Sequence, residues 1–140
     1  MERGKDGGFT FISGATGGLG RAFAFACAEE GDLFLTGRSE HKLALLRDEL
    51  HKKYPERRVE YCPADLTDEH SRRAMYDYVV GKGLFFSRLV HVAGADIQKA
   101  FEKYTDEKIV LQCRVNLEAA LSITRFILSR RGKAFETVTV

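Results

Sequence analysis

Hydrophobic and polar positions alternate along this chain in two different periods. Short runs of apolar and β-branched residues predict strands over residues 8–13, 32–36, 59–62, 84–93 and 135–140. Between them, apolar residues recur every three to four positions, which predicts helices over 19–30, from Ser39 to Pro55, from Thr67 to Gly81 and over 105–131. Strands that alternate with such helices form parallel βαβ units with helices on both sheet faces. The pattern therefore predicts a doubly wound parallel α/β sheet.

Helix ends and faces refine this prediction. Ser39, Thr67 and Thr105 each precede a helical pattern and are expected to cap it. The helix over 105–131 is the longest and has two apolar stripes. One comprises Val110, Cys113, Leu117, Leu121 and Leu128, and the other Ile109, Ala120, Ile123 and Ile127. A helix on a sheet buries one stripe, so the second is expected to meet another helix or another subunit.

Composition excludes several classes of protein. The 140 residues are 44% hydrophobic and 30% charged, with a formal net charge of +2, as expected for one soluble domain. Intermixed charges give no field that would attract nucleic acid, and no apolar run approaches the ~18–20 residues of a membrane span. Cys27, Cys62 and Cys113 are expected to be buried, reduced thiols of a cytoplasmic protein. The four histidines have no metal-ligand spacing, so no metal site is expected.

The strongest motif is a glycine loop over residues 13–20, Ser-Gly-Ala-Thr-Gly-Gly-Leu-Gly, between the first strand and the first helix. Without a Cβ, glycine permits a tight turn, the approach of a pyrophosphate to the backbone, and close packing of helix on strand. The helix N-terminus then offers unpaired N–H groups to the phosphates. Glycine spacing alone would fit a flexible turn, but the strand before it and the helix after it favour a Rossmann-type nucleotide site.

With these residues the chain resembles the short-chain dehydrogenase/reductase family, whose opening motif is TGxxxGxG. Ser13 stands for the threonine, and Gly14, Gly18 and Gly20 match. Asp65-Leu66 matches the family's acidic residue beside the adenine, residues 91–94 stand where the family has Asn-Asn-Ala-Gly, and Asn116 matches its catalytic asparagine. His91 and Val92 depart from the pattern, which leaves the local polar network open; we interpret His91 as structural rather than catalytic.

The resemblance implies a set of cofactor-binding residues and a dimer through the helix over 105–131, hence a homo-oligomer. The implied cofactor residues are Ser13, Gly14, Thr16, Gly18, Leu19, Gly20, Arg38, Ser39, Asp65, Leu66, Ala93 and Gly94. The end of the second strand selects the nicotinamide type, because an acidic residue there binds the ribose of NAD whereas arginine binds the 2′-phosphate of NADP. Arg38 and Ser39 occupy this position and favour NADP(H); a surface arginine at a helix start is the alternative.

Proton transfer in the family uses a serine after the fifth strand and a Tyr-x-x-x-Lys pair on the next helix. Of that set, residues 1–140 contain only Asn116. Tyr78–Lys82 and Tyr104–Lys108 have the spacing, but both lie in other elements. We therefore expect an NADP(H)-binding domain, incomplete at its C-terminus and inactive alone, from an oxidoreductase that acts on a small-molecule carbonyl or alcohol. Asp96 and Gln98 are candidates to line the substrate pocket.

Two alternatives stay open. A non-catalytic module could hold a dinucleotide without redox chemistry. A flavodoxin-like phosphate binder is disfavoured, since Arg38 and Asp65 would have no ligand to explain them.

Overall fold

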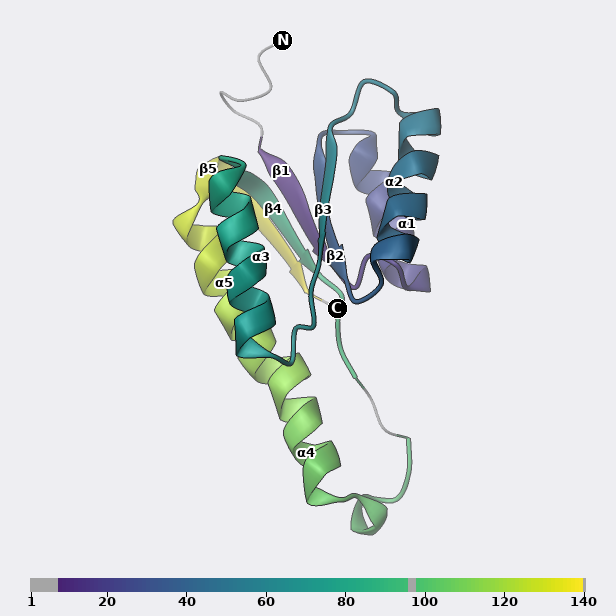
Figure 1. The fold of residues 1–140 in the computed structure, drawn as a ribbon, viewed down its shortest axis with the longest axis vertical. Coiled ribbons are helices and arrows are strands. Elements are labelled where there is room, and N and C mark those ends of the chain that lie inside the picture. The colour runs from purple at the N-terminus through teal and green to yellow at the C-terminus, as the bar shows by residue number, and fades with distance from the viewer. Residues whose placement is uncertain (1–7, 96–97, 140) are drawn as a thin grey trace.

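The computed structural model describes residues 8–95 and 98–139. They form one parallel sheet with the strand order β3-β2-β1-β4-β5 (Figure 1). The strands are β1 (Phe9–Ser13), β2 (Leu33–Gly37), β3 (Val59–Pro63), β4 (Phe86–His91) and β5 (Arg131–Thr139). Consecutive strands on each side of β1 are joined by helices, so the predicted α/β class with a doubly wound parallel sheet is confirmed.

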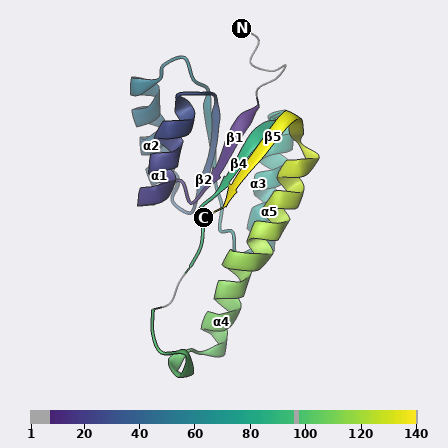
Figure 2. The same cartoon turned by 180° about the vertical axis from the view of Figure 1, so that it is seen from behind.

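Helices cover both faces of the sheet. Helices α1 (Gly18–Ala28) and α2 (Glu40–Lys53) lie on one face, and α3 (Glu69–Gly81) and α5 (Ala119–Ser129) on the other (Figures 1 and 2). Helix α4 (Asp106–Cys113) joins α5 through a π turn (Arg114–Glu118) and projects beyond the sheet, with a 3₁₀ turn (Phe101–Lys103) before it. The expected single helix over 105–131 is therefore interrupted by the π turn.

The core has two halves, one on each side of the sheet. Phe11, Phe34 and Phe86 pack under α3 and α5, with Phe11 and Phe34 stacked at 5.3 Å. Ile12 and Leu35 pack under α1 and α2. Strand β1 is buried along its whole length. Because β1 lies in the middle of the sheet and ends in the glycine loop, the loop begins from a fully buried strand.

Two of the three predicted caps are confirmed and one is wrong. The side chains of Ser39 and Thr105 accept hydrogen bonds from the backbone N–H groups of Lys42 and Lys108. Helix α3 is capped by Asp68, whose carboxylate accepts from the N–H of His70, and not by Thr67. The Thr67 hydroxyl instead donates to Asp65 Oδ1 at 2.7 Å, within the loop that precedes α3.

Burial of the apolar helix faces differs from expectation at several positions. Ile123 and Ile127 of α5 are buried against the sheet, whereas Leu117 and Leu121 are 59% and 62% exposed. The free stripe is thus the one that contains Leu117 and Leu121. Helix α1 buries only one side: Ala22 and Ala26 are exposed.

The predicted burial of three cysteines holds only for Cys27, because Cys62 is half-buried and Cys113 lies on the exposed side of α4. All three are free thiols.

Candidate functional site

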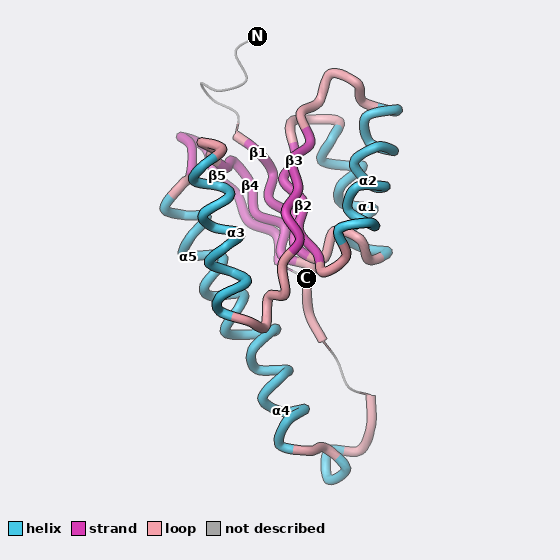
Figure 3. Tube along the Cα trace, in the orientation of Figure 1, coloured by secondary structure: helices cyan, strands magenta, loops and turns pink. Residues whose placement is uncertain are grey.

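The order of the strands reverses at the carboxyl edge between β1 and β4. The chain winds from β1 to β2 on one side of β1, while β4 pairs with β1 on the other side. In parallel sheets, ligands bind outside the carboxyl ends of the strands at such a reversal. The loops that follow the first four strands all emerge at this edge (Figure 3). They carry the glycine loop, Arg38, Asp65 and Ala93.

The structure gives a different reason for glycine at each of the three motif positions. Gly14 has a φ of +62°, in the left-handed region that favours glycine, and a Cβ there would lie 2.9 Å from the Ala93 nitrogen. A Cβ on Gly20 would lie 1.9 Å from the Gly14 carbonyl oxygen. At Gly18, by contrast, a Cβ would have no neighbour within 4 Å. Gly14 and Gly20 are thus required by packing, while Gly18 leaves open space at the N-terminus of α1, where an anion is stabilised.

Ser13 connects the glycine loop to the loop after β4. Its Oγ accepts hydrogen bonds from the N–H groups of Val92 and Ala93, both at 3.1 Å, and lies 2.8 Å from His91 Nδ1. Because the two N–H groups occupy the acceptor positions of the hydroxyl oxygen, its hydrogen is directed to His91 Nδ1, which leaves the ring proton on Nε2. Although His91 and Val92 replace the two asparagines of the family pattern, hydrogen bonds of Ser13 therefore still join the two loops.

His91 contributes to this junction as a neutral ring. It is buried, and its Nε2 has no hydrogen-bond partner within residues 8–95 and 98–139. Burial lowers the pKa of His91, since the imidazolium would lose its hydration. These contacts agree with the structural role predicted for this histidine.

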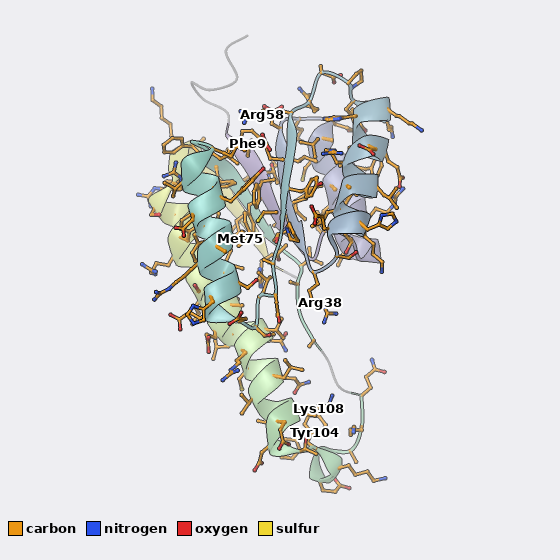
Figure 4. The ribbon with its side chains drawn as sticks, in the orientation of Figure 1. Phe9, Arg38, Arg58, Met75, Tyr104 and Lys108 are labelled. Carbon is orange, nitrogen blue, oxygen red and sulfur yellow. The ribbon has the colours of Figure 1, made fainter. Side chains whose placement is uncertain are left out.

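Arg38 and Asp65 lie at the same edge, after β2 and β3. The two strands are joined there by the N–H of Ala64, which donates to the Gly37 carbonyl at 2.9 Å. Arg38 is exposed and lies below the carboxyl edge of the sheet (Figure 4). Within the described part of the chain it forms no ion pair.

Asp65 is held as a carboxylate. The hydrogen bonds from the Thr67 hydroxyl and N–H, followed by the positive charge of Arg38, lower the pKa of Asp65. Arg38 and Asp65 therefore place opposite charges at the same edge of the sheet, where the resemblance implies the 2′-phosphate and adenine parts of a nucleotide.

Asn116 lies in the π turn and pairs with the loop after β4. Its Oδ1 accepts from the N–H of Ala95 at 2.8 Å, and its Nδ2 donates to the Ala95 carbonyl at 2.7 Å. A Cβ on Gly94 would lie 3.1 Å from Asn116 Oδ1. The candidate catalytic residue is therefore positioned by the loop that also carries Ala93 and Gly94.

The remaining predicted cofactor residues follow β1, β2 and β3 at the same edge of the sheet. Thr16 is half-buried beside Gly37, and Leu19 is 49% exposed at the start of α1. Ser39 uses its oxygen to cap α2. Leu66 packs its side chain in the core, so the backbone, and not the side chain, is what Leu66 can offer to a ligand.

The two Tyr-x-x-x-Lys spacings are not brought to this edge. Tyr104 and Lys108 lie at the far end of the projecting helix (Figure 4). Tyr78 lies on α3, where its hydroxyl donates to Glu60 at 3.1 Å. Burial and the Glu60 carboxylate raise the pKa of Tyr78 to about 12, which makes it a poor proton donor near neutral pH. Asp96 lies outside the described residues, and Gln98 is exposed.

Sequence reasoning missed the residues that hold the Asp65-Leu66 peptide. The N–H of Asp65 donates to Ser71 Oγ at 2.8 Å, and Arg72 Nη1 donates to the Leu66 carbonyl at 2.7 Å. Arg72 is only 4% exposed. A signal was available, because Arg72 falls on the same helical stripe as the buried Met75 and Val79, where a charge requires partners.

The described residues contain neither a membrane-spanning helix nor a metal-binding cluster. No helix among them is long and apolar enough to cross a membrane. They also contain no cluster of three or more histidine, cysteine or acidic side chains that could hold a metal ion.

Comparison with protein families gives a match to the short chain dehydrogenase model over residues 9–134. Among curated proteins, a very-long-chain 3-oxoacyl-CoA reductase-like protein of Arabidopsis thaliana is 31% identical over 137 residues, which covers 90% of this chain and 42% of that protein. A very-long-chain 3-oxoacyl-CoA reductase of Caenorhabditis briggsae is 38% identical over 58 residues, 41% of this chain and 18% of that one.

Solved structures match over a similar share. The L-sorbose reductase of Gluconobacter frateurii, complexed with NADPH and L-sorbose, superposes with a TM-score of 0.82 at 25% identity, covering 92% of this chain and 49% of that one. An alcohol dehydrogenase of the archaeon Thermococcus sibiricus, complexed with 5-hydroxy-NADP, gives a TM-score of 0.81 at 26% identity and covers 88% and 52%. The chain thus spans about half the length of these two enzymes, and less than half of the curated relatives.

Proposed function

This chain belongs to the short chain dehydrogenase family, and from that premise we propose that it is the NADP(H)-binding part of an oxidoreductase that interconverts a carbonyl and an alcohol. When bound, the cofactor would supply or accept the hydride. The observation that carries the proposal is Arg38, an exposed arginine without an ion pair in the described structure, opposite the ionised Asp65. A guanidinium in this position can bind a phosphate through two parallel N–H donors.

The chain's own residues divide the binding between them. The open space at Gly18 admits a pyrophosphate to the N-terminus of α1. Arg38 and the Ser39 hydroxyl would hold the 2′-phosphate, and Asp65 with the Leu66 backbone would contact the adenine. Ala93 and Gly94 follow β4 at the same edge of the sheet, and Ser13 keeps their loop close to the glycine loop. The site thus fits an extended dinucleotide that crosses the carboxyl edge.

The substrate would be a small molecule with a ketone or a secondary alcohol. The proteins compared above are named as reductases of a 3-oxoacyl-CoA and of L-sorbose and as an alcohol dehydrogenase, and these reactions share a carbonyl carbon. Asn116 would lie beside the reacting end, because it pairs with the loop after β4. Within residues 8–95 and 98–139, neither tyrosine of the two Tyr-x-x-x-Lys spacings is positioned to transfer a proton, so we propose that these 140 residues bind the cofactor without turnover.

The test of cofactor type is calorimetric titration of NADPH and NADH into the 140-residue chain and into Arg38→Asp. A hydrogen bond to a charged group contributes about 1.5–3 kcal/mol, so we expect NADPH to bind about ten- to a hundred-fold more tightly than NADH and Arg38→Asp to abolish this preference. Arg47→Asp is the control, since Arg47 lies on α2 and pairs with Asp48. Equal affinities for the two cofactors in the parent chain would refute the proposal.

We also propose that the protein is a homo-oligomer and that a second copy covers the stripe of Leu117 and Leu121. Support comes from the exposure of these leucines on the helix that the resemblance assigns to the dimer. Isolated surface leucines need no explanation, but a continuous stripe on one helix marks an interaction site.

A further inference from the structure

Arg72 is a buried arginine that touches two parts of the site at once. It extends from the first turns of α3, and its side chain is shielded from solvent. Nη1 donates to the Leu66 carbonyl at 2.7 Å, and Nη2 donates to Glu118 Oε1 at 2.9 Å. Leu66 follows Asp65 at the proposed adenine end of the site, while Glu118 is the last residue of the π turn that contains Asn116. These two segments are 52 residues apart in the sequence.

The partners of Arg72 are attached to the site by contacts of their own. On one side, two residues of α3 hold the Asp65-Leu66 segment. The N–H of Asp65 donates to Ser71 Oγ, and Arg72 donates to the Leu66 carbonyl. On the other side, the π turn is anchored by Asn116, whose amide pairs with both backbone groups of Ala95. A movement of the Leu66 carbonyl therefore reaches Asn116 through one guanidinium and one carboxylate.

The π turn that contains Asn116 depends on the hydrogen bond between Glu118 and Arg72 for its position. A π turn is a rare insertion in an α-helix and is frequently found at functional sites. Here the N–H of Ala119 bonds to the Arg114 carbonyl, five residues back. None of the residues of the π turn is buried, so packing does little to hold its register. The charge-assisted hydrogen bond from Arg72 is thus a principal contact that sets where Glu118, and with it Asn116, lies.

We propose that Arg72 is a positioning residue that couples the adenine end of the cofactor site to Asn116. In the parent chain, an ordered Asp65-Leu66 peptide holds the Arg72 guanidinium, the guanidinium holds Glu118, and Glu118 fixes the π turn. Nucleotide bound at the adenine end thereby tightens the pairing between Asn116 and Ala95 without touching either residue. The ligand part of this inference rests on the proposed function, whereas the contacts of Arg72 with Leu66 and Glu118 do not.

The first experiment uses the chain without ligand and measures amide hydrogen exchange at Ala95 by NMR. Glu118→Ala removes a carboxylate that is 54% exposed. The Ala95 amide is expected to exchange about ten-fold faster, as for the loss of one charge-assisted hydrogen bond. Glu118→Gln keeps an oxygen acceptor for Arg72 and should restore most of the protection.

The matched control is Glu69→Ala, which removes another exposed carboxylate paired with an arginine of α3, Arg73, at 2.8 Å. It should leave Ala95 unchanged. Equal exchange of Ala95 in the parent, Glu118→Ala and Glu69→Ala would overturn the proposal.

The second experiment adds adenosine 2′,5′-bisphosphate, which carries the adenine and the 2′-phosphate but has no nicotinamide to reach Asn116. It should slow exchange of the Ala95 amide in the parent chain and shift the side-chain NH₂ resonances of Asn116. In Glu118→Ala it should still bind, yet change neither signal. The same response in Glu118→Ala as in the parent would overturn the coupling. Failure of the fragment to bind the parent would instead refute the proposed cofactor, and the ligand-free exchange at Ala95 would still decide the role of Arg72.

Discussion

The glycine loop and the projecting helix α4 both adjoin the candidate site, but they are held in opposite ways. In the glycine loop, Cβ atoms at Gly14 and Gly20 would collide with backbone, and Ser13 is buried with its oxygen shared among three partners. Helix α4 has no buried residue at all. The glycine loop, which we propose binds the nucleotide, is thus held by close packing, whereas helix α4, which leads to Asn116, is not.

The largest effect is expected inside the glycine loop itself. Gly20→Val places a branched side chain where even a Cβ would lie 1.9 Å from the Gly14 oxygen, and overpacking against backbone should destabilise the fold by about 3 kcal/mol or more. Gly18→Ala meets nothing within 4 Å, so its free energy of unfolding should change by less than about 0.5 kcal/mol.

Gly20→Val and Gly18→Ala also distinguish effects on folding stability from effects on NADPH binding. Although folded, Gly18→Ala should bind NADPH about ten-fold or more weakly, because its methyl group displaces a phosphate from the backbone N–H groups. Urea unfolding and calorimetry measure the two quantities. A folded Gly18→Ala with undiminished affinity would contradict this division of roles.

The next largest effect contrasts two neighbouring positions of α5. Ile123 is fully buried and Leu121 is 62% exposed. Ile123→Ala should therefore lower the free energy of unfolding by about 2–4 kcal/mol through lost burial and cavity formation, while Leu121→Ala should cost less than about 0.5 kcal/mol. Urea denaturation of both variants at a low protein concentration checks this; similar costs would mean that the exposed stripe is covered.

The junction of the two loops should show a smaller, pH-dependent effect. His91 has a pKa below its ordinary 6.5 in the folded chain, so below pH 6.5 the unfolded chain binds a proton that the folded chain does not. Stability is unaffected above that pH and falls as the pH decreases toward the lowered pKa, by up to about 1.4 kcal/mol per pH unit. His91→Asn, which keeps a partner for Ser13 but does not titrate, should have a shallower slope of urea midpoint against pH. Identical slopes would rule out this contribution.

The smallest effect on monomer stability is expected for the exposed stripe. Leu117→Lys with Leu121→Lys changes two side chains that are more than half exposed, so the free energy of unfolding should change little. If a second copy covers the stripe, the double variant should sediment as a monomer under conditions where the parent chain sediments as a dimer. A parent that is itself monomeric at high concentration would contradict the homo-oligomer.

Most of the fold could be predicted because its signals are local. Each strand except β5 combines apolar residues with a following glycine or turn, and Ser39 and Thr105 cap their helices through N–H groups only three residues away. The same holds for Gly20, whose close neighbours are Gly14 and Ala15, but not for the close approach at Gly14, which is to Val92 and Ala93 of another loop. Local hydrogen bonding and sterics act whatever the rest of the molecule does, so they can be read from sequence.

The departures have tertiary causes. Strand β5 begins at Arg131, although Arg131, Gly132 and Lys133 have no strand pattern, because β4 offers an open edge: the N–H of Phe86 donates to the Arg130 carbonyl and Phe86 pairs with Arg131. Thr67 does not cap α3; its hydroxyl donates instead to the Asp65 carboxylate. The π turn was not foreseen either, since nothing within residues 114–118 requires it.

By itself, then, the sequence determined the order of strands and helices, the glycine loop, the position of Arg38 after β2 and the family to which the chain belongs. Tertiary structure alone decided which stripe of the long helix faces the sheet, which atom of Ser13 joins the two loops, and that Arg72 bridges Leu66 and Glu118. The physical reason is distance along the chain. Contacts within one turn depend on neighbouring residues, whereas a guanidinium between residues 66 and 118 acquires its partners only after α3 and α5 have packed side by side, as Tyr76 and Phe126 do at 4.0 Å.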